Sequence, residues 1–212
     1  MSNINLNWLK NNINVTHPII FDIGCADMQD SIMFKTQIEN SSVYAFECAD
    51  VWKEQNLIKA KENNINYFHT AISGNDTPVV FYPSGKLKSE AWPWSGSIFE
   101  PSKFLLTDDW SWEDPYTVDS ISLNSLCAKY NIKPDFIHID VQGAEYDIFK
   151  NINNDFKPPI IWAEISEFHM YNTGVTYQNF KELLESHGYV EHYTSNNDAL
   201  YILATLTVAP YI

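Results

Sequence analysis

The sequence predicts an α/β fold in which helices cover both faces of a mostly parallel sheet that ends in an antiparallel C-terminal edge strand. Short apolar runs alternate with segments of helical periodicity along most of the 212 residues, which is typical of a parallel sheet. The last two apolar runs, 188–194 and 199–206, are joined by a link too short for a parallel crossover, so they predict a hairpin. We therefore expect one Rossmann-like domain over residues 1–212.

Each expected element follows from a local pattern. Leu6, Trp8 and Leu9 predict an amphipathic helix at 4–12, and a buried strand follows at 18–23. Further helices are expected at 30–39, 50–63, 122–130, 144–152 and 176–187. Further strands are expected at 43–47, 65–69, 78–82, 117–121, 135–140 and 159–165. No internal repeat or linker divides the chain, so a single domain is the simplest interpretation.

Residues 83–116 form a long aromatic-rich insertion that fits no regular element. Four tryptophans, at positions 92, 94, 110 and 112, lie among prolines in this stretch. Connections of this length are uncommon unless they serve as lids or binding loops, and aromatic side chains suit stacking on sugar faces or covering a flat ligand. A minor aromatic core beneath a long loop is the alternative, and the sequence leaves both open.

The composition is that of a globular protein with a formal net charge of −14. So acidic a surface repels nucleic acid and anionic membranes, and no lysine cluster is longer than Lys86-Leu87-Lys88. No apolar run is long enough to cross a bilayer, and no secretory signal pattern is found, so we expect a cytoplasmic protein. The expected partner is a neutral or cationic small molecule or a glycan, and the sequence does not predict the oligomeric state.

Acids and glycines follow two of the N-terminal strands. The strand at 18–23 contains Asp22 and is followed by Gly24, whose missing side chain lets backbone amides approach a ligand. The next apolar run ends in Glu47, at roughly the 20-residue separation at which a second strand delivers a carboxylate to a ribose. This order of strand, glycine turn, helix, strand and acid predicts a nucleoside-binding βαβ unit.

The segment 135–145 is the most informative run of the chain. Its strand ends in Asp140, and a glycine turn leads into a helix that begins near Glu145. Ligands bind at the carboxyl ends of strands in open parallel sheets, so both acids are site candidates. For either acid alone, capping of the helix is the alternative. His138 alternates with isoleucines inside the strand and is expected to be a packed core residue rather than a catalyst.

Five segments in this order resemble the FkbM-type S-adenosylmethionine-dependent methyltransferases. They are 22–31, 43–47, 69–76, 95–101 and 135–149, and the resemblance covers about residues 17–204. The block at 135–149 is the most specific of the five. The resemblance implies the sheet of class I methyltransferases, which has an antiparallel strand near its C-terminal edge, and S-adenosylmethionine as the cofactor.

The resemblance also implies roles for individual residues. Asp22, Gly24 and Cys25 correspond to the loop under the methionine part of the cofactor, and Asp30 and Ser31 to polar groups near its amino acid end. Glu47 corresponds to the acid that accepts hydrogen bonds from both ribose hydroxyls. The adenine pocket and the surroundings of the sulfonium correspond to Ala71, Ile72, Ser73 and Asp140.

Two positions depart from the family pattern. Family members commonly have a second glycine where this chain has Met28, and often an asparagine where it has Ala26. Met28 would crowd the cofactor if its backbone needs a positive φ, which is a costly conformation for methionine. We expect either a rerouted loop or weakened cofactor affinity.

The implied reaction is methylation of a hydroxyl on a sugar, a glycan or a small metabolite. Methyl transfer requires alignment of the acceptor and removal of its proton, and Asp140 is the first candidate for base or for electrostatic partner of the sulfonium. Glu145 is expected to orient Asp140 or to bind acceptor hydroxyls. Glu164, Glu167 and His169 follow the strand 159–165 and should reach the same edge, with His169 as the alternative base.

A metal is not part of this interpretation. Asp140, Glu164 and His169 could instead hold a divalent ion such as Mg²⁺, which remains the alternative. The spacing of the cysteines indicates neither a disulfide framework nor a zinc site, and these residues are expected to fill small buried positions: Cys25, Cys48 and Cys127.

Two other classes of function are compatible with parts of the sequence. Gly24 and Glu47 alone would also serve a nicotinamide dinucleotide in an oxidoreductase or an epimerase, but the three-glycine spacing is missing and the terminal hairpin argues against it. The third hypothesis is a non-catalytic nucleoside-binding module that has lost its cofactor loop, and Met28 is the only residue that supports it.

Overall fold

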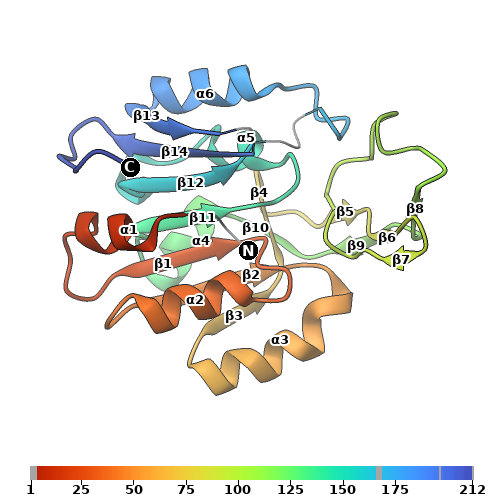
Figure 1. Ribbon diagram of the computed structural model, residues 1–212, viewed down its shortest axis with the longest axis horizontal. Coiled ribbons are helices and arrows are strands. Elements are labelled where there is room, and N and C mark those ends of the chain that lie inside the picture. Colours follow the sequence, from red (N-terminus) through yellow and green to blue (C-terminus); the bar gives the residue numbers. More distant parts are fainter. Residues whose placement is uncertain (1–3, 166–168, 196, 212) are drawn as a thin grey trace.

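A seven-stranded sheet organises the structure, a computed structural model that describes residues 4–165, 169–195 and 197–211. The strands lie in the order β13-β14-β12-β11-β1-β2-β3 (Figure 1). Their bounds are β1 (Ile19–Ile23), β2 (Ser42–Glu47), β3 (Asn66–His69), β11 (Phe136–Ile139), β12 (Ile160–Glu164), β13 (Tyr189–Thr194) and β14 (Asp198–Leu203). β1, β2, β3, β11 and β12 pair in parallel, and β14 runs antiparallel to both of its neighbours.

The predicted C-terminal hairpin is confirmed. β13 and β14 pair antiparallel, and β14 in turn pairs with β12, so the hairpin forms one edge of the sheet with β13 outermost. The predicted fold class, a mostly parallel sheet with an antiparallel C-terminal edge strand, is confirmed, and the strand that runs against the parallel strands is β14, with β13 paired antiparallel to it at the edge.

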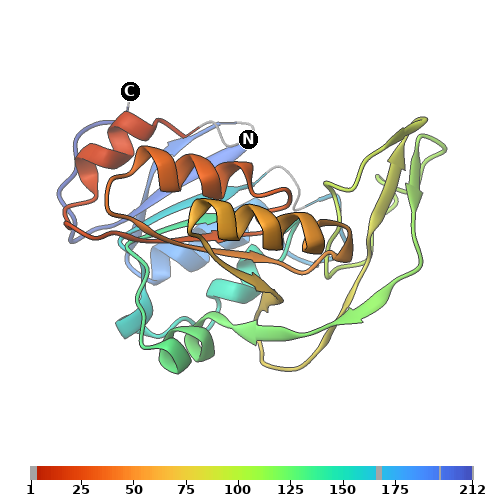
Figure 2. The ribbon, with the colours of Figure 1, turned by 90° about the horizontal axis from the view of Figure 1, so that it is seen from below.

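Helices cover both faces of this sheet (Figure 2). Their bounds are α1 (Leu6–Asn12), α2 (Gln29–Gln37), α3 (Asp50–Asn63), α4 (Leu123–Tyr130), α5 (Glu145–Phe149), the 3₁₀ turn η1 (Asn154–Phe156) and α6 (Tyr177–Ser186). α1, α2 and α3 bury Leu9, Phe34 and Ala60 in the core of one face, whereas α4, α5 and α6 bury their apolar side chains in the core of the other. Among the described residues, no helix is long and apolar enough to span a membrane.

Local sequence explains these elements. All four residues of β11 are buried, as expected for a central parallel strand between two helical layers. Two helices begin at hydroxyl caps: Ser122 accepts a hydrogen bond from the amide of Ser125, and Thr176 forms a reciprocal capping box with Asn179. The expected helices and strands of the central sheet are therefore found within a few residues of their predicted bounds.

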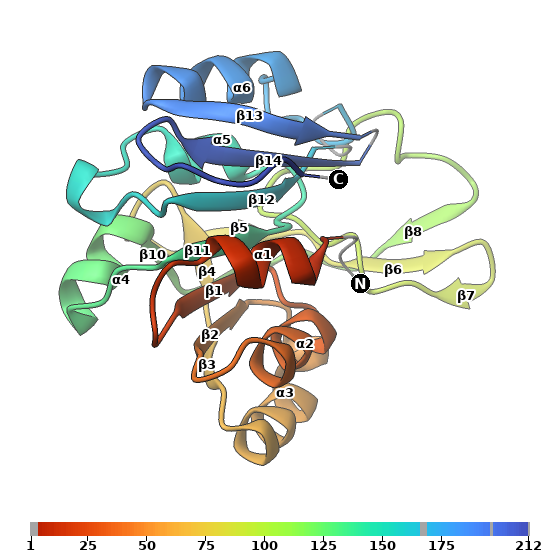
Figure 3. The same cartoon turned by 60° about the vertical axis from the view of Figure 1, so that its left-hand side comes forward.

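The insertion at 83–116, which we call the arm, is more regular than the sequence predicts. β6 (Ser84–Leu87), β7 (Glu90–Ala91) and β8 (Trp110–Trp112) form a small antiparallel sheet, and β5 (Val79–Phe81) pairs with β9 (Tyr116–Val118) at its base. Figures 1 and 3 show the arm extending away from the central sheet, beyond the carboxyl ends of the parallel strands. The arm is therefore placed at the edge where a ligand site was predicted.

One predicted strand is divided in two. The expected strand at 117–121 is split between β9 and β10 (Ser120–Ser122), because the two halves pair with different partners. β10 pairs in parallel with β4 (Ala71–Ser73), a short strand that the sequence analysis did not separate from its surroundings. Strands of three residues carry too few side chains to produce a readable alternation.

The tip of β1 makes a close backbone contact with the tip of β11. Gly24 has a φ of +82°, and a Cβ at this position would lie 1.8 Å from the carbonyl oxygen of Asp140. The amide of Gly24 donates to the carbonyl of Phe46, and the amide of Asp140 donates to the carbonyl of Ile23. Only glycine permits this arrangement, since both the backbone angle and the space exclude a side chain.

Met28 has a positive φ, the condition under which crowding of the cofactor was expected, yet it does not line the cavity at the strand tips. Its φ is +70°, and it precedes α2 in a left-handed conformation. Its side chain is fully buried among the apolar residues beneath α1 and α2, which include Leu9 and Phe34. Burial of the thioether side chain offsets the unfavourable backbone angle. Ala26 has a φ of +42°, so this loop contains two residues with left-handed backbone angles.

We expect Gly24→Ala to destabilise the fold by at least about 2 kcal/mol, because the new Cβ must displace the backbone of Asp140. Gly188→Ala is the matched control: φ there is +88°, but no atom lies within 4 Å of the added Cβ. The control should cost only about 1 kcal/mol. Urea unfolding of both variants measures the difference, and equal losses would show that the contact with Asp140 is unimportant.

Candidate active site

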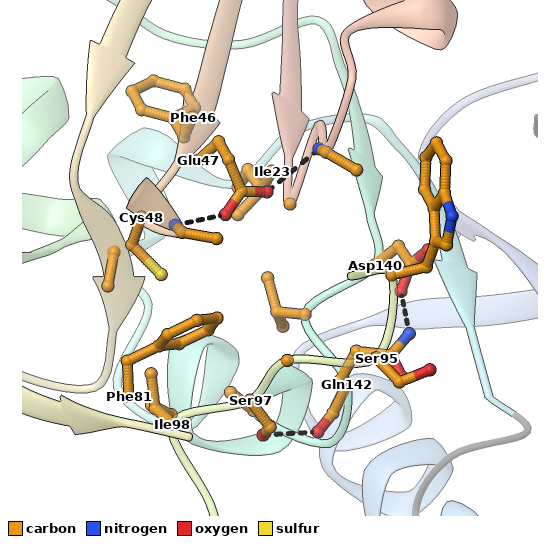
Figure 4. Close-up of a pocket in the computed structure, with 18 of the residues that line it drawn as sticks. Ile23, Phe46, Glu47, Cys48, Phe81, Ser95, Ser97, Ile98, Asp140 and Gln142 are labelled. Atoms are coloured by element: carbon orange, nitrogen blue, oxygen red, sulfur yellow. Dashed lines mark hydrogen bonds between the residues drawn. The ribbon is translucent and has the colours of Figure 1, made fainter. Parts of the chain in front are cut away.

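The carboxyl ends of the central strands surround a cavity of about 440 Å³ (Figure 4). Its walls come from the tips of β1, β2, β11 and β12, from α3 and from the arm. This volume lies within the range of small-molecule sites, roughly 300–1,000 Å³. The sequence-predicted residues that line the cavity are Gly24, Glu47, Ala71, Ile72, Asp140 and Glu164.

Glu47 faces the cavity from the end of β2, held by two backbone amides (Figure 4). Its Oε1 accepts a hydrogen bond from the amide of Ala49 at 2.7 Å, and its Oε2 from the amide of Ala26 at 2.9 Å. Burial raises the pKa of Glu47 to about 7, against the opposing effect of the backbone hydrogen bonds. A carboxylate has further lone pairs, so Glu47 can still accept hydrogen bonds from a ligand.

Asp140 and Glu164 face the cavity from the ends of β11 and β12, and one side chain joins them. The Nε2 group of Gln142 lies 2.6 Å from Asp140 Oδ1 and 3.3 Å from Glu164 Oε2. Gln142 also lines the cavity and is almost fully buried. The sequence analysis did not single it out, although its place between Asp140 and a turn glycine was the available signal.

Residues 92–98 of the arm, which we call the strap, cover one side of the cavity. Trp94 of the strap packs against Trp52 of α3 with ring centroids 4.7 Å apart, and both line the cavity. Ser97 Oγ donates to the carbonyl oxygen of Gln142 at 2.8 Å (Figure 4). Trp92 and Trp94 of the insertion therefore line the cavity, whereas Trp110 and Trp112 stack on each other outside the cavity lining.

Asp22 and Ser31 do not line the cavity. Asp22 is fully buried, accepts a hydrogen bond from Ser31 Oγ and pairs with His138 Nδ1 at 2.7 Å. Burial alone would lower the pKa of His138, but the hydrogen bond to Asp22 and the nearby acids outweigh it and raise the pKa to about 9. His138 is thus a buried cation that balances Asp22, and this pairing turns both predicted cofactor residues, Asp22 and Ser31, toward the core.

Five other predicted site residues lie outside the cavity lining: Cys25, Asp30, Ser73, Glu145 and His169. Cys25 is buried in the core beneath α2, and Ser73 hydrogen-bonds Ser120 across the β4–β10 pair. His169 is exposed and its ring contacts Phe104 of the arm. Position 167, the remaining candidate, lies outside the described residues.

The alternative of a divalent metal finds no geometric support. Among the described residues, no group of three histidine, cysteine, aspartate or glutamate side chains is placed to hold an ion. The side-chain amide of Gln142 lies between Asp140 and Glu164, and His169 does not line the cavity that these two acids face. The cysteines are unpaired: Cys25 and Cys127 are buried as expected, whereas Cys48 is half-buried and lines the cavity.

The cavity is acidic. Glu47, Asp140 and Glu164 line it, and none of the described lining residues is basic. All 13 basic side chains of the protein are lysines, so no guanidinium can form the bidentate contacts that phosphates favour. This arrangement suits a ligand that carries positive charge near the strand tips and no phosphate.

Glu145 lies beneath the cavity and is held by its own turn. Its Oε1 accepts from the amide of Val141 at 3.0 Å, and its buried Oε2 has no hydrogen-bond partner in the described part of the chain. Burial raises the pKa of Glu145 to about 8, so this carboxyl is mostly neutral at pH 7. The folded state therefore binds this proton more tightly than the unfolded chain does.

We expect Glu145 to make the free energy of unfolding decrease as pH rises from about 4.5 to about 8, approaching about 1.4 kcal/mol per pH unit. Over that interval the unfolded chain has lost the proton and the folded protein retains it. Glu145→Gln should remove this contribution, and the exposed Glu182→Gln serves as the control. Urea unfolding at several pH values measures the slopes, and an unchanged slope in Glu145→Gln contradicts the assignment.

Comparison with known proteins agrees with this fold. Residues 22–191 match the FkbM methyltransferase domain. The 2-O-methyltransferase NoeI of Sinorhizobium fredii is 28% identical over 178 residues, which span 80% of this chain and 72% of that protein. A Staphylococcus aureus structure assigned to the caffeoyl-CoA O-methyltransferases has a TM-score of 0.52 at 13% identity, over 96% of this chain and 84% of that one. A fibrillarin from Methanococcus jannaschii has a TM-score of 0.48 at 14% identity, over 91% and 68% of the two chains.

The similarity to the Staphylococcus aureus structure shows the fold alone, because the identity is low. The family match covers most of the chain and confirms the resemblance seen in the sequence. This family match favours a methyltransferase over the dinucleotide-dependent oxidoreductase or epimerase. The chain belongs to the FkbM methyltransferase domain family, and S-adenosylmethionine is its cofactor.

Proposed function

We propose that the protein transfers a methyl group from S-adenosylmethionine to a hydroxyl of a small, uncharged acceptor such as a sugar or a glycan. The observation that supports this most directly is the pair of carboxylates, Asp140 and Glu164, in the same cavity as Glu47. A carboxylate beside the reaction centre can take up the proton that a hydroxyl loses. NoeI is a 2-O-methyltransferase, which agrees with an oxygen acceptor.

The residues of the cavity fit the cofactor. Glu47 offers a carboxylate at the end of β2 for the two ribose hydroxyls, and Ala71 and Ile72 offer small apolar surfaces for the adenine. The acids at the strand tips suit the positive charge of a sulfonium. Met28, the departure that suggested weakened binding or a non-catalytic module, has its side chain in the core and leaves this space free.

The cofactor supplies a methyl group on a positively charged sulfur. Glu164 and the strap orient the acceptor hydroxyl toward that methyl group, and Asp140 accepts the hydroxyl proton. The cofactor, held by Glu47, Ala71 and Ile72, would supply the methyl group to the hydroxyl oxygen and leave as neutral S-adenosylhomocysteine, while the hydroxyl proton would pass to Asp140. Asp140 is preferred over His169 as the base because Asp140 lines the cavity and His169 does not.

The strap contributes uncharged aromatic side chains to the part of the cavity where we place the acceptor. Trp92 and Trp94 line it from the strap and remain partly exposed, at 37% and 41%. Flat aromatic faces that are open on one side suit stacking against a sugar ring. The absence of basic side chains among the described lining residues, together with the net charge of −14, favours such an acceptor over nucleic acid.

We expect Glu47→Gln to weaken S-adenosylhomocysteine binding by about 1–3 kcal/mol, because charge-assisted hydrogen bonds to the ribose are lost. In the wild type, affinity should decrease as pH falls from 8 to 6, since Glu47, with a pKa of about 7, takes up a proton over that interval. Titration calorimetry measures both effects, with Glu182→Gln as the control. Wild-type affinity in Glu47→Gln would mean that the nucleoside binds elsewhere.

We expect Asp140→Asn to lower kcat by roughly 100-fold or more while S-adenosylhomocysteine affinity changes by less than about threefold. The assay incubates the protein with S-adenosylmethionine and a panel of monosaccharides, oligosaccharides, phenols, amines and thiols. Mass spectrometry then identifies any acceptor that gains one methyl group. Methylation restricted to amines or thiols would refute transfer to oxygen.

A further inference from the structure

Gln142 contacts both cavity acids with one side-chain amide. Its Nε2 donates to Asp140 Oδ1 at 2.6 Å and to Glu164 Oε2 at 3.3 Å. A primary amide carries two N–H donors, so each acid can receive one. Two carboxylates that share a site repel each other, and N–H donors placed between them offset part of that repulsion. The Gln142 amide therefore determines where the Asp140 carboxylate lies.

The remaining polar atoms of Gln142 contact the strap and its neighbour Tyr171. The backbone carbonyl oxygen of Gln142 accepts a hydrogen bond from Ser97 Oγ at 2.8 Å. Its side-chain Oε1 lies 3.1 Å from the hydroxyl of Tyr171. That hydroxyl also lies 2.6 Å from the carbonyl oxygen of Ser95, and because it carries one proton it donates to one of these two oxygens at a time. Gln142 is 7% exposed, so water cannot readily replace these contacts. One residue thus joins the acids of two strands to the strap.

The backbone at this position is unusual for a glutamine. Gln142 has a φ of +57° and is followed by Gly143 with a φ of +101°. Residues other than glycine rarely adopt this conformation unless their surroundings determine it. The sharp turn returns the Gln142 side chain toward Asp140, only two residues earlier (Figure 4). We interpret the hydrogen bonds of the Gln142 side chain as the interactions that maintain this backbone conformation.

We propose that Gln142 is a positioning residue that holds the Asp140 carboxylate at the reaction centre and couples its position to closure of the strap. This inference rests on the proposed role of Asp140. With the strap in place, Ser97 and Tyr171 fix Gln142, and its amide fixes Asp140. When the strap moves to admit or release a ligand, these contacts are lost and the acid is no longer held.

Gln142→Met tests the amide, because methionine has a similar length and forms no comparable hydrogen bonds. We expect kcat to fall roughly 10- to 100-fold, with the acceptor KM and the S-adenosylhomocysteine affinity changed by less than about threefold. Gln178→Met, at an exposed glutamine of α6, is the matched control and should behave as the wild type. Ser97→Ala removes the hydrogen bond from the strap to the Gln142 backbone carbonyl, together with the bond that Ser97 Oγ accepts from the amide of Phe99, and leaves the side-chain amide of Gln142 in place. This variant should lower kcat by a smaller factor.

Two readouts require no turnover. In Gln142→Met, the affinity for S-adenosylmethionine relative to S-adenosylhomocysteine should fall roughly 3- to 10-fold, because a displaced Asp140 no longer faces the positive sulfur. Chymotrypsin should cut the ligand-free strap after Trp94 faster in Gln142→Met and in Ser97→Ala than in the wild type, whereas the bond after Trp92 is protected by Pro93. These readouts remain informative if the wild type methylates no hydroxyl, an outcome that would refute only the proposed function.

Gln142→Glu adds a test by pH. The titratable groups that face this position are Asp140, Glu164 and Tyr171, with Glu145 beneath the turn and Glu47 across the cavity. Above neutral pH the introduced carboxylate should repel Asp140, so kcat should fall at least as far as in Gln142→Met. As pH is lowered toward 6, the introduced group takes up a proton and can donate to Asp140, so part of kcat should return.

The outcomes separate a positioning role from a merely structural one. Loss of kcat with a lowered affinity ratio, faster strap cleavage and partial recovery of Gln142→Glu at low pH supports the inference. Wild-type kcat and affinity ratio in Gln142→Met overturn it. Equal losses of kcat, of S-adenosylhomocysteine affinity and of thermal stability, without recovery of Gln142→Glu at low pH, also overturn it, since they indicate that Gln142 serves only the fold.

Discussion

The site depends on how closely the first parallel strand approaches its two neighbours at their carboxyl ends. The amide of Gly24 donates a hydrogen bond to the carbonyl of Phe46 on one side. On the other side, the carbonyl of Asp140 occupies the space where a Cβ of residue 24 would lie. These contacts bring the ends of β2 and β11 to either side of a single glycine. The Glu47 and Asp140 side chains consequently open into one cavity rather than two.

Collecting acids at one edge of a sheet is unfavourable, and the structure compensates for it locally. Backbone amides hold Glu47, the amide of Gln142 serves Asp140 and Glu164, and the buried cation of His138 balances Asp22. No lysine among the described lining residues neutralises the acids of the cavity. A positively charged ligand would therefore complete the electrostatic balance, which is consistent with the sulfonium of the cofactor.

The central sheet could be predicted from sequence because its strands are continuous apolar runs separated by helical patterns, and its C-terminal hairpin follows from a short link. The candidate acids at strand ends could be located because the carboxyl ends of parallel strands meet at one edge. Side-chain direction could not be predicted: Asp22 and Ser31 turn toward His138, which sequence spacing does not reveal. The strands of the arm could not be predicted either, since they are short. The place of Gln142 in the site could not be predicted because it depends on contacts with the strap, which is distant in the sequence.

The most direct test of this account is a crystal structure of the protein with S-adenosylhomocysteine. We expect the ribose hydroxyls to lie within hydrogen-bond distance of Glu47, and the sulfur to face Asp140 with the strap closed over it. The adenine should contact Ala71 and Ile72. A nucleoside bound away from Glu47, or a cavity that remains without ligand at saturating concentration, would contradict the central claim that the strand tips form the methyl-transfer site.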